Sequence, residues 1–243
     1  MGGGVAAVSG PGPTVDIAGN VARTRERIAR AAERAGRRAE EICLVAAAKQ
    51  VTAERVQAAV AAGVTDIGEN YVQEAAAKRA QVGEAARWHL IGHLQTNKAK
   101  QAAQIFDIIE TVDSRRIAEA IGKRGREAGR EVEVLLQVNT SGEASKFGVA
   151  PEEAERLLEQ VAAVPGIRMC GLMTIGRWSA DREEARPEFR LLARLAEQLR
   201  GRVGVELKWL SMGMSHDFEV AIEEGANLVR IGTGIFGPRP GEG

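Results

Sequence analysis

The 243-residue sequence predicts an α/β protein folded as a single (β/α)8 barrel, and two features of the chain support this prediction. Short apolar runs alternate about eight times with stretches of helical periodicity, the pattern of a parallel sheet covered by helices. No change of composition marks a linker, and eight such units in a chain of this length fit one barrel. An open doubly wound sheet is the alternative. It is disfavoured because no GxGxxG turn follows the first apolar run.

The individual elements follow from the spacing of apolar residues. Apolar runs bounded by polar residues predict buried strands, and apolar residues three and four positions apart predict helices. The expected strands span 43–50, 64–68, 88–92, 105–112, 132–139, 168–175, 205–211 and 228–231. The expected helices span 15–38, 52–62, a stretch after Asn70, 96–104, 115–128, 151–164, 181–200 and 215–224. Thr52 as an N-cap, Gly63 as a helix stop and Pro151 as a first helical residue support these boundaries.

Composition argues against several classes of function. Lys plus Arg and Asp plus Glu both number 33, so no overall basic field would attract nucleic acid or an anionic membrane. No apolar segment approaches the roughly 20 residues of a membrane span. The Gly-rich opening lacks the charged region of a signal peptide, so we expect a flexible tail over 1–14 and one domain over 15–243. Cys43 and Cys170 are expected to be buried free thiols in a cytoplasmic protein, and their isolation gives no metal-site spacing.

Two basic residues stand at unusual places in the predicted strands. Lys49 ends the first apolar run, and parallel α/β folds place their chemistry at such strand ends. A surface lysine where the strand reaches solvent is the alternative. Arg230 lies within the otherwise apolar eighth strand, where a guanidinium needs a partner. It is expected to point to the barrel interior or to the outer helices, and an ion pair with a core glutamate is the alternative to a functional role.

Glycines and hydroxyls after the last two strands suggest an anion site. Gly232 and Gly234 allow a close approach of the backbone and offer N–H groups to an anion. The segment 211–215 places two hydroxyls and a glycine just before a helix. Asp217 would repel a phosphate on the helix axis, so we favour the backbone of 211–215 as the cradle. Ordinary helix capping is the alternative.

Taken together, these groups match the needs of pyridoxal 5′-phosphate (PLP). A lysine forms a Schiff base with it, loops hold its phosphate, and a polar group pairs with its pyridine nitrogen. Lys49 would have to be partly desolvated to present a free amine at neutral pH. The small residues Ala46 to Ala48 leave room for a ring.

Seven segments are similar, in order and across nearly the whole chain, to the pyridoxal phosphate homeostasis protein family, relatives of the alanine racemase N-terminal barrel: AAAKQ, GENYVQE, WHLIGHLQTNK, NTSGEASKFG, GLMTIG, SMGMSHDFEVAI and VRIGTGIFG. The resemblance implies a barrel with PLP as a Schiff base on Lys49 and with Arg230 facing the pyridine nitrogen. An arginine does not readily give the ring a proton, so the ring stays a weaker electron sink. Asn70 and Met173 are expected to border the ring, with a core position as the alternative for Met173. The implied phosphate contacts are Ser211, Met212, Gly213, Ser215, Gly232 and Thr233.

The resemblance also bears on catalysis. Racemisation through PLP needs two acid/base groups on opposite faces of the substrate carbon. In alanine racemases the second group is a tyrosine from an additional C-terminal domain of the partner subunit, whereas this chain stops shortly after the eighth strand. Tyr71 is the only tyrosine, and Lys146 stands where racemases carry a carboxylate-binding arginine. We therefore expect a monomeric protein that holds or delivers PLP and keeps vitamin B6 and amino-acid pools in balance, with little or no turnover.

Other interpretations and residues stay open. A PLP-dependent amino-acid racemase is one alternative function, and a Schiff-base aldolase acting on a sugar phosphate without PLP is another. Beyond PLP, the expected partners are apo PLP-dependent enzymes. His89 and His93 would share a face of one strand roughly 13 Å apart, too far for one metal ion. No role is assigned to His93, Lys146 or His216, and Lys123, Arg124 and Arg126 are expected to form a solvated helix face.

Overall fold

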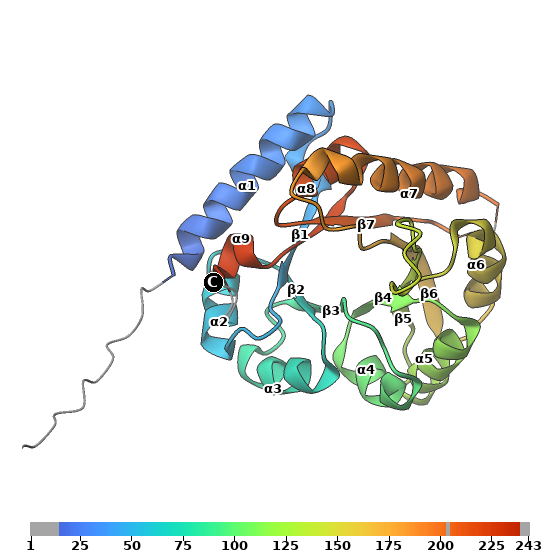
Figure 1. The fold of residues 1–243 in the computed structure, drawn as a ribbon. Coiled ribbons are helices and arrows are strands. Elements are labelled where there is room, and N and C mark those ends of the chain that lie inside the picture. Colours follow the sequence, from blue (N-terminus) through green and yellow to red (C-terminus); the bar gives the residue numbers. More distant parts are fainter. Residues whose placement is uncertain (1–14, 203–204, 239–243) are drawn as a thin grey trace, which may run out of the picture.

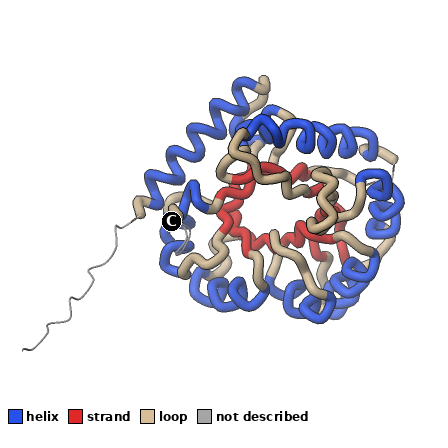
Figure 2. Tube along the Cα trace, in the orientation of Figure 1, coloured by secondary structure: helices blue, strands red, loops and turns tan. Residues whose placement is uncertain are grey.

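The computed structural model describes residues 15–202 and 205–238, and these form a closed barrel of eight parallel strands. The strands follow chain order around the ring, which closes where β1 pairs with β8 (Figure 1). Figure 2 shows the strands as an inner ring and the helices as an outer one. The predicted barrel is confirmed and the open doubly wound sheet is wrong, whereas the tail predicted over 1–14 lies outside the described residues. The strands are β1 (Cys43–Ala47), β2 (Asp66–Glu69), β3 (Arg87–Leu90), β4 (Ile108–Val112), β5 (Val132–Gln137), β6 (Ile167–Met173), β7 (Trp209–Met214) and β8 (Leu228–Ile231).

The helices pack around the outside of the strands, and the first helix buries the apolar face of an amphipathic sequence. α1 (Ile17–Arg34) begins after Asp16, whose carboxylate accepts a hydrogen bond of 2.9 Å from the Gly19 N–H. Its buried residues recur three and four positions apart, and it packs against α8 and α9. No described helix is long and apolar enough to cross a membrane. The other helices are α2 (Ala53–Ala61), α3 (Val72–Val82), α4 (Ala99–Ile105), α5 (Arg115–Glu127), α6 (Ala154–Ala162), α7 (Arg186–Leu199), α8 (Phe218–Glu223) and α9 (Thr233–Phe236), with 3-10 turns η1 (Ala39–Glu41), η2 (Thr96–Lys98), η3 (Pro151–Glu153) and η4 (Arg182–Ala185).

The core consists of two apolar clusters separated by the sheet. The larger cluster lies between the strands and the helices. The smaller cluster lies inside the barrel and comprises Val45, Ile108, Leu135, Cys170, Met173, Trp209 and Leu228. Val229 and Ile231 belong to the larger cluster, so Arg230 between them faces the barrel interior, because successive strand residues face opposite sides.

Some predicted boundaries were wrong, for different physical reasons. β7 begins at Trp209 rather than at residue 205 and continues to Met214, because its pairing with β6 and β8 fixes where the ladder starts. β4 begins at Ile108 rather than at residue 105, since residue 105 is the apolar end of α4. An apolar residue at the end of a helix has the same local pattern as the start of a strand.

Candidate functional site

Lys49 lies at the mouth of the barrel, two residues beyond the end of β1. Its side chain is partly buried, and its Nζ lies 5.8 Å from the centroid of the Tyr71 ring, just before α3. Gln50 follows with a φ of 60°, the only positive φ among the described non-glycine residues. Lys49 is therefore a partly buried lysine just beyond the end of a strand, and its role as an anchor stays a prediction.

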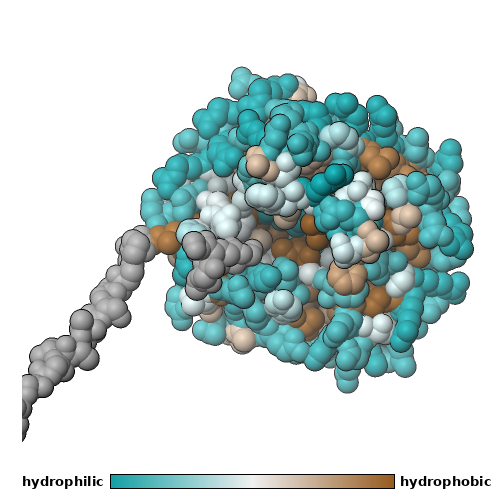
Figure 3. Space-filling model, in the orientation of Figure 1, coloured by the Kyte–Doolittle hydropathy of each residue, from teal (hydrophilic) through white to brown (hydrophobic). Residues whose placement is uncertain are grey.

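A cavity of about 290 Å³ lies beside the C-terminal ends of β1, β7 and β8. Figure 3 shows a hollow in the middle of the viewed face, with apolar residues inside it and hydrophilic residues around its rim. The cavity volume is near the lower end of the range for small-molecule sites, about 300–1,000 Å³. Its lining residues are Ala47, Trp178, Ser179, Met214, Ser215, His216, Asp217, Arg230, Gly232 and Thr233.

Backbone donors converge in this cavity on a single oxygen atom. The Gly232 and Gly234 N–H groups donate to Ser215 Oγ at 3.2 and 3.3 Å. A Cβ on Gly232 would lie 3.3 Å from the Ala47 carbonyl oxygen, so glycine permits the close approach of β8 to β1. We call Ser215, Gly232 and Gly234 the glycine cradle. Two N–H groups directed at one oxygen form an arrangement that suits an anion.

The segment 211–215 contributes less of its backbone to the cradle than we expected. The Met214 N–H donates to Asp217 Oδ1 at 2.7 Å, so this carboxylate takes a donor that was assigned to the anion. Burial raises the pKa of Asp217 above its usual value, against hydrogen bonding by the Met214 N–H and the charge of Arg230. Asp217 therefore keeps an anion away from the start of α8 both by its charge and by occupying a donor.

Ser211, Met212 and Gly213 belong to β7 and do not line the cavity. The Ser211 hydroxyl is buried and donates to Glu110 Oε2 at 2.6 Å. Met212 packs in the larger cluster, between the sheet and the helices. Gly213 has a φ of 90°, and a Cβ there would lie 2.6 Å from the Cβ of Ala221. Ser211 and Met212 therefore stabilise the barrel, and Gly213 lets α8 pack against β7.

Arg230 lines the cavity and is also tied to the barrel interior. Its guanidinium donates to Ser211 Oγ and, at 2.8 Å, to the Thr174 carbonyl oxygen. The distance from Arg230 Nη1 to Glu110 Oε2 is 3.8 Å, so the core glutamate of the alternative interpretation is present. The guanidinium held by this interior ion pair also borders the cavity, and its functional role stays a prediction.

A chain of polar groups, buried except for Arg87 at its far end, continues from Arg230 through the barrel. Glu110 Oε1 lies 2.7 Å from His89 Nδ1, and His89 Nε2 lies 2.9 Å from Asp66 Oδ1. The Arg87 guanidinium donates to the same Asp66 oxygen at 2.9 Å. Inward positions of five strands supply these groups. We call the set of Arg87, Asp66, His89, Glu110, Ser211 and Arg230 the interior polar chain.

The interior polar chain holds alternating charges. Burial lowers the pKa of His89, but hydrogen bonds to Asp66 and Glu110 outweigh it and raise the pKa to about 9. Burial alone would raise the pKa values of both carboxyls, yet hydrogen bonds and charge from His89 lower them below their usual values. An imidazolium therefore lies between two carboxylates at neutral pH, and the second carboxylate faces Arg230.

The remaining predicted residues lie around the mouth or below it. Asn70 is half-buried, and its carbonyl oxygen lies 2.4 Å from where a Gly92 Cβ would be. Met173 is fully buried in the smaller cluster, which is the core position given as its alternative. Neither lines the cavity, and Lys49 does not line it either, although Ala47 two residues earlier does.

The residues left without a role also find partners. His93 stacks on Phe147 with ring centroids 3.7 Å apart. Because β3 ends at Leu90, the expectation that His89 and His93 share a strand was wrong. Lys146 donates to the Gly176 carbonyl oxygen at 3.0 Å, and the exposed His216 lies 3.2 Å from the Ala180 carbonyl oxygen.

Sequence reasoning missed the interior polar chain and an ion pair beside Lys49. Glu69 Oε1 and Lys78 Nζ lie 2.5 Å apart at the end of β2 and the middle of α3. The signal for the chain was present in the polar residues at inward positions of predicted strands, such as Asp66 and Glu110. The signal for the ion pair was weaker, because a lysine nine residues after a glutamate has no characteristic spacing.

Comparison with known proteins identifies the family of this chain. Residues 20–240 match the family model for the alanine racemase N-terminal domain. A pyridoxal phosphate homeostasis protein of Aquifex aeolicus is 42% identical over 90% of this chain and 96% of its own length. This chain belongs to the pyridoxal phosphate homeostasis protein family. The resemblance inferred from the seven sequence segments is thereby confirmed.

Other members of the pyridoxal phosphate homeostasis protein family extend the comparison. The Pseudomonas aeruginosa protein is 43% identical over 92% of this chain and 96% of its own length. The structure of PipY from Synechococcus elongatus with PLP bound has a TM-score of 0.80 at 33% identity. The match covers 91% of this chain and all of PipY, so the two barrels correspond over their full extent.

Proposed function

We propose that this chain binds PLP at the barrel mouth and holds or delivers it, with little or no catalytic turnover, so that vitamin B6 and amino-acid pools stay in balance. The observation that carries the proposal is the glycine cradle, in which two backbone N–H groups converge on Ser215 Oγ beside Arg230. PLP bound in PipY and the names of the family's members support the same cofactor here.

The residues present fit this cofactor. We propose that a phosphate oxygen takes the place of Ser215 Oγ as the acceptor of the Gly232 and Gly234 N–H groups, with the Ser215 hydroxyl as a further donor, and Gly232 leaves the cavity free of a side chain at that point. Arg230 is a cation fixed in the cavity wall, so it favours an unprotonated pyridine nitrogen beside it. Lys49 follows Ala47, a cavity residue, by two positions. We propose that its amine condenses with the PLP aldehyde, which forms a C=N bond and releases one water molecule.

Tyr71 bears on whether the protein is a carrier or a racemase. It is the only tyrosine of the chain, and its ring centroid lies 5.8 Å from Lys49 Nζ. Racemisation needs a second acid/base group on the opposite face of the substrate carbon, and we propose that Tyr71, as a neighbour of the Lys49 amine, does not serve as that group. Rapid turnover in an amino-acid racemase assay would overturn this part of the proposal.

The compartment and partners belong to the proposal as well. Cys170 is buried as expected, whereas Cys43 is only partly buried, and both are free. Burial raises the pKa values of Cys43 and Cys170 to about 12 and about 11, which supports unreactive thiols in a reducing cytoplasm. We propose a monomer that gives PLP to apo PLP-dependent enzymes. Mixing the loaded protein with such an apoenzyme should restore the apoenzyme's activity faster than the same amount of PLP released passively into solution.

The absorption spectrum of the purified protein tests the proposal. After incubation with PLP, we expect a Schiff-base band in the wild type and its loss in Lys49→Ala. Lys208→Ala is the matched control, because Lys208 is exposed before β7 at the opposite end of the barrel. A wild type without the band, or a Lys49→Ala variant with a band of equal strength, would show that Lys49 does not hold the cofactor.

A further inference from the structure

The two peptide groups that flank Lys49 are both held by side chains of α3. Lys78 Nζ donates to the Ala48 carbonyl oxygen at 2.8 Å. On the other side, the Gln50 N–H donates to Glu74 Oε2 at 3.2 Å. Lys78 and Glu74 are themselves paired at 3.3 Å. One helix thus holds the backbone on both sides of Lys49. The Lys49 side chain makes none of these hydrogen bonds.

The backbone at this point requires such support. Gln50 has a φ of 60°, in the left-handed region that is unfavourable for a residue with a side chain. Such a conformation persists only when its surroundings fix it. The bond from Gln50 to Glu74 fixes one end, and the Ala48 carbonyl oxygen also accepts from the Val51 N–H at 3.0 Å. The turn therefore sets the direction in which Lys49 leaves the strand.

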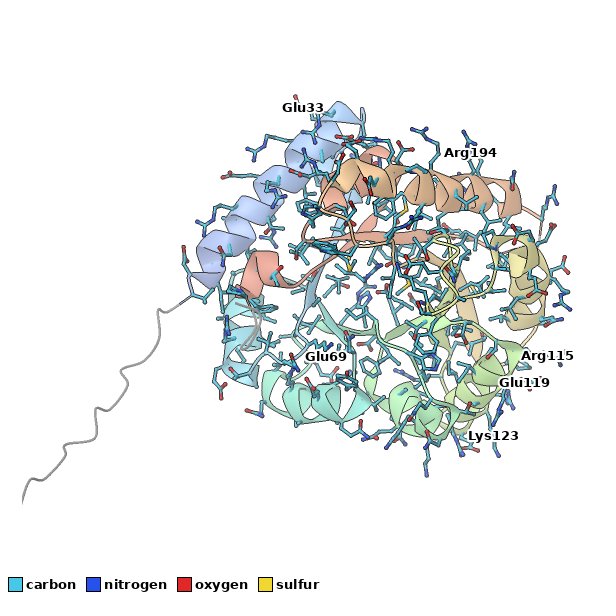
Figure 4. The ribbon with its side chains drawn as sticks, in the orientation of Figure 1. Glu33, Glu69, Arg115, Glu119, Lys123 and Arg194 are labelled. Carbon is cyan, nitrogen blue, oxygen red and sulfur yellow. The ribbon has the colours of Figure 1, made fainter. Side chains whose placement is uncertain are left out.

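Lys78 is in turn anchored to the barrel by Glu69. The two side chains are 2.5 Å apart, and Glu69 is fully buried at the end of β2, facing α3 (Figure 4). Glu69 Oε2 is buried without a hydrogen-bond partner in the described part of the chain, and burial raises the pKa of Glu69 despite Lys78. A buried pair with an unsatisfied oxygen is a costly way to join a helix to a strand, since apolar residues would pack there at lower cost.

We propose that Lys78 and Glu74 are positioning residues for Lys49, which hold the turn around it so that its amine is directed for condensation with an aldehyde. This inference rests on the proposed function of Lys49. The residues act through the backbone of Lys49 and do not bind the cofactor. They should therefore matter for a ligand that forms the C=N bond and not for one that only fills the cavity.

Two ligands separate these effects. PLP carries the aldehyde, whereas pyridoxine 5′-phosphate carries the same ring and phosphate with an alcohol in its place. In Lys78→Met the aliphatic stem remains but the bonds to Ala48 and Glu69 are lost. We expect PLP affinity to fall about tenfold, the effect of roughly one lost hydrogen bond. Pyridoxine 5′-phosphate affinity, measured by calorimetry, should stay within about twofold of the wild type, and Lys78→Arg, which keeps a charged donor, should recover most of the PLP affinity.

The controls keep this inference separate from the proposed function. Lys123→Met makes the same substitution on the exposed face of α5 (Figure 4) and should change neither affinity. If Lys78→Met does not fold by circular dichroism, Glu74→Ala decides with the same two ligands, and a selective loss of PLP affinity of about threefold is expected. An equal loss for both ligands, or no loss for either, overturns the positioning role. A wild type that forms no Schiff base instead refutes the proposed function.

Discussion

The two sides of the barrel mouth are held in place from opposite directions. On the side of β1 and β2, side chains of the outer helix α3 hold the backbone around Lys49. On the side of β7 and β8, the support comes from the barrel interior, where Glu110 and Ser211 fix Arg230 beneath the glycine cradle. The backbone around Lys49 is thus held from outside the sheet, and Arg230 beside the glycine cradle is held from inside it.

The two sides also differ in the type of residue that adopts a positive φ. Gln50 keeps a side chain at a φ of 60°, whereas β7 uses a glycine, Gly213, at a φ of 90°. A Cβ on Gly213 would lie 2.8 Å from the Phe218 Cα, so α8 packs directly on the strand. On the side of Lys49, hydrogen bonds from side chains hold the residue with the positive φ. On the side of the cradle, a glycine adopts the positive φ without strain and leaves room for α8 against β7.

The largest effect should follow from breaking the interior support. Arg230→Met leaves Glu110 with one positive partner fewer and the Thr174 carbonyl oxygen without its guanidinium donor. We expect the free energy of unfolding to fall by about 3–5 kcal/mol, as for other buried pairs that lose one partner. Urea denaturation monitored by circular dichroism measures this change.

A second substitution distinguishes the lost charge from lost packing. In Arg230→Lys a positive charge remains near Glu110, so less stability should be lost than in Arg230→Met. The comparison predicts that Lys78→Met costs less stability than Arg230→Met, since Lys78 is not enclosed by the barrel. An equal or larger loss for Lys78→Met would contradict the distinction between outer and inner support.

The charge of His89 should make the interior support dependent on pH. Its pKa rises from 6.5 to about 9 on folding, so its contribution is complete below pH 6.5 and is lost as pH rises through about 9. The fully buried imidazole makes this difference worth about 2–3 kcal/mol of unfolding free energy over that interval. Urea denaturation at several pH values between 6.5 and 9 measures the decline.

His89→Gln is the control for this decline. The variant should be less stable at neutral pH, but its unfolding free energy should change much less between pH 6.5 and 8.5. At higher pH both proteins should lose stability, because burial raises the pKa values of Cys43 and Cys170 as well. A decline of the same size in His89→Gln would show that the imidazolium is not its source.

The sequence was sufficient for the barrel and for placing Arg230 on the opposite face of its strand from Val229 and Ile231, but it left open whether that face is the barrel interior. The alternation of apolar runs with helical stretches predicted the order of elements, and the eighth strand was placed at 228–231, where the structure has it. Val229 and Ile231 are apolar on both sides of Arg230, so period two placed the guanidinium on one face of the strand. Closure of the sheet brings the first and last strands together. No local sequence pattern contains this long-range contact.

The hydrogen-bond and ion-pair partners at the site could not be predicted from the sequence pattern, and the reasons are physical. Glu110 lies about half the chain away from Arg230, and only the register of several strands brings the two together. The bond from Met214 to Asp217 depends on where β7 ends, and that boundary was misplaced. The backbone on both sides of Lys49 is held by α3, whose contact with the turn has no sequence signature.

The smallest effects should come from exchanging a side chain and a glycine at two positions with a positive φ, Gly213 and Gln50. Gly213→Ala adds a Cβ at a positive φ, 2.6 Å from the Ala221 Cβ, and should lower the unfolding free energy by about 2 kcal/mol. Gln50→Gly relieves the strain and should raise it by about 0.5 kcal/mol, since the greater freedom of glycine in the unfolded chain offsets part of the gain. Thermal unfolding of the two variants should therefore shift in opposite directions. If Gln50→Gly instead destabilised the protein, the side chain of Gln50 would itself belong to the support around Lys49, and the turn would be held by more than α3.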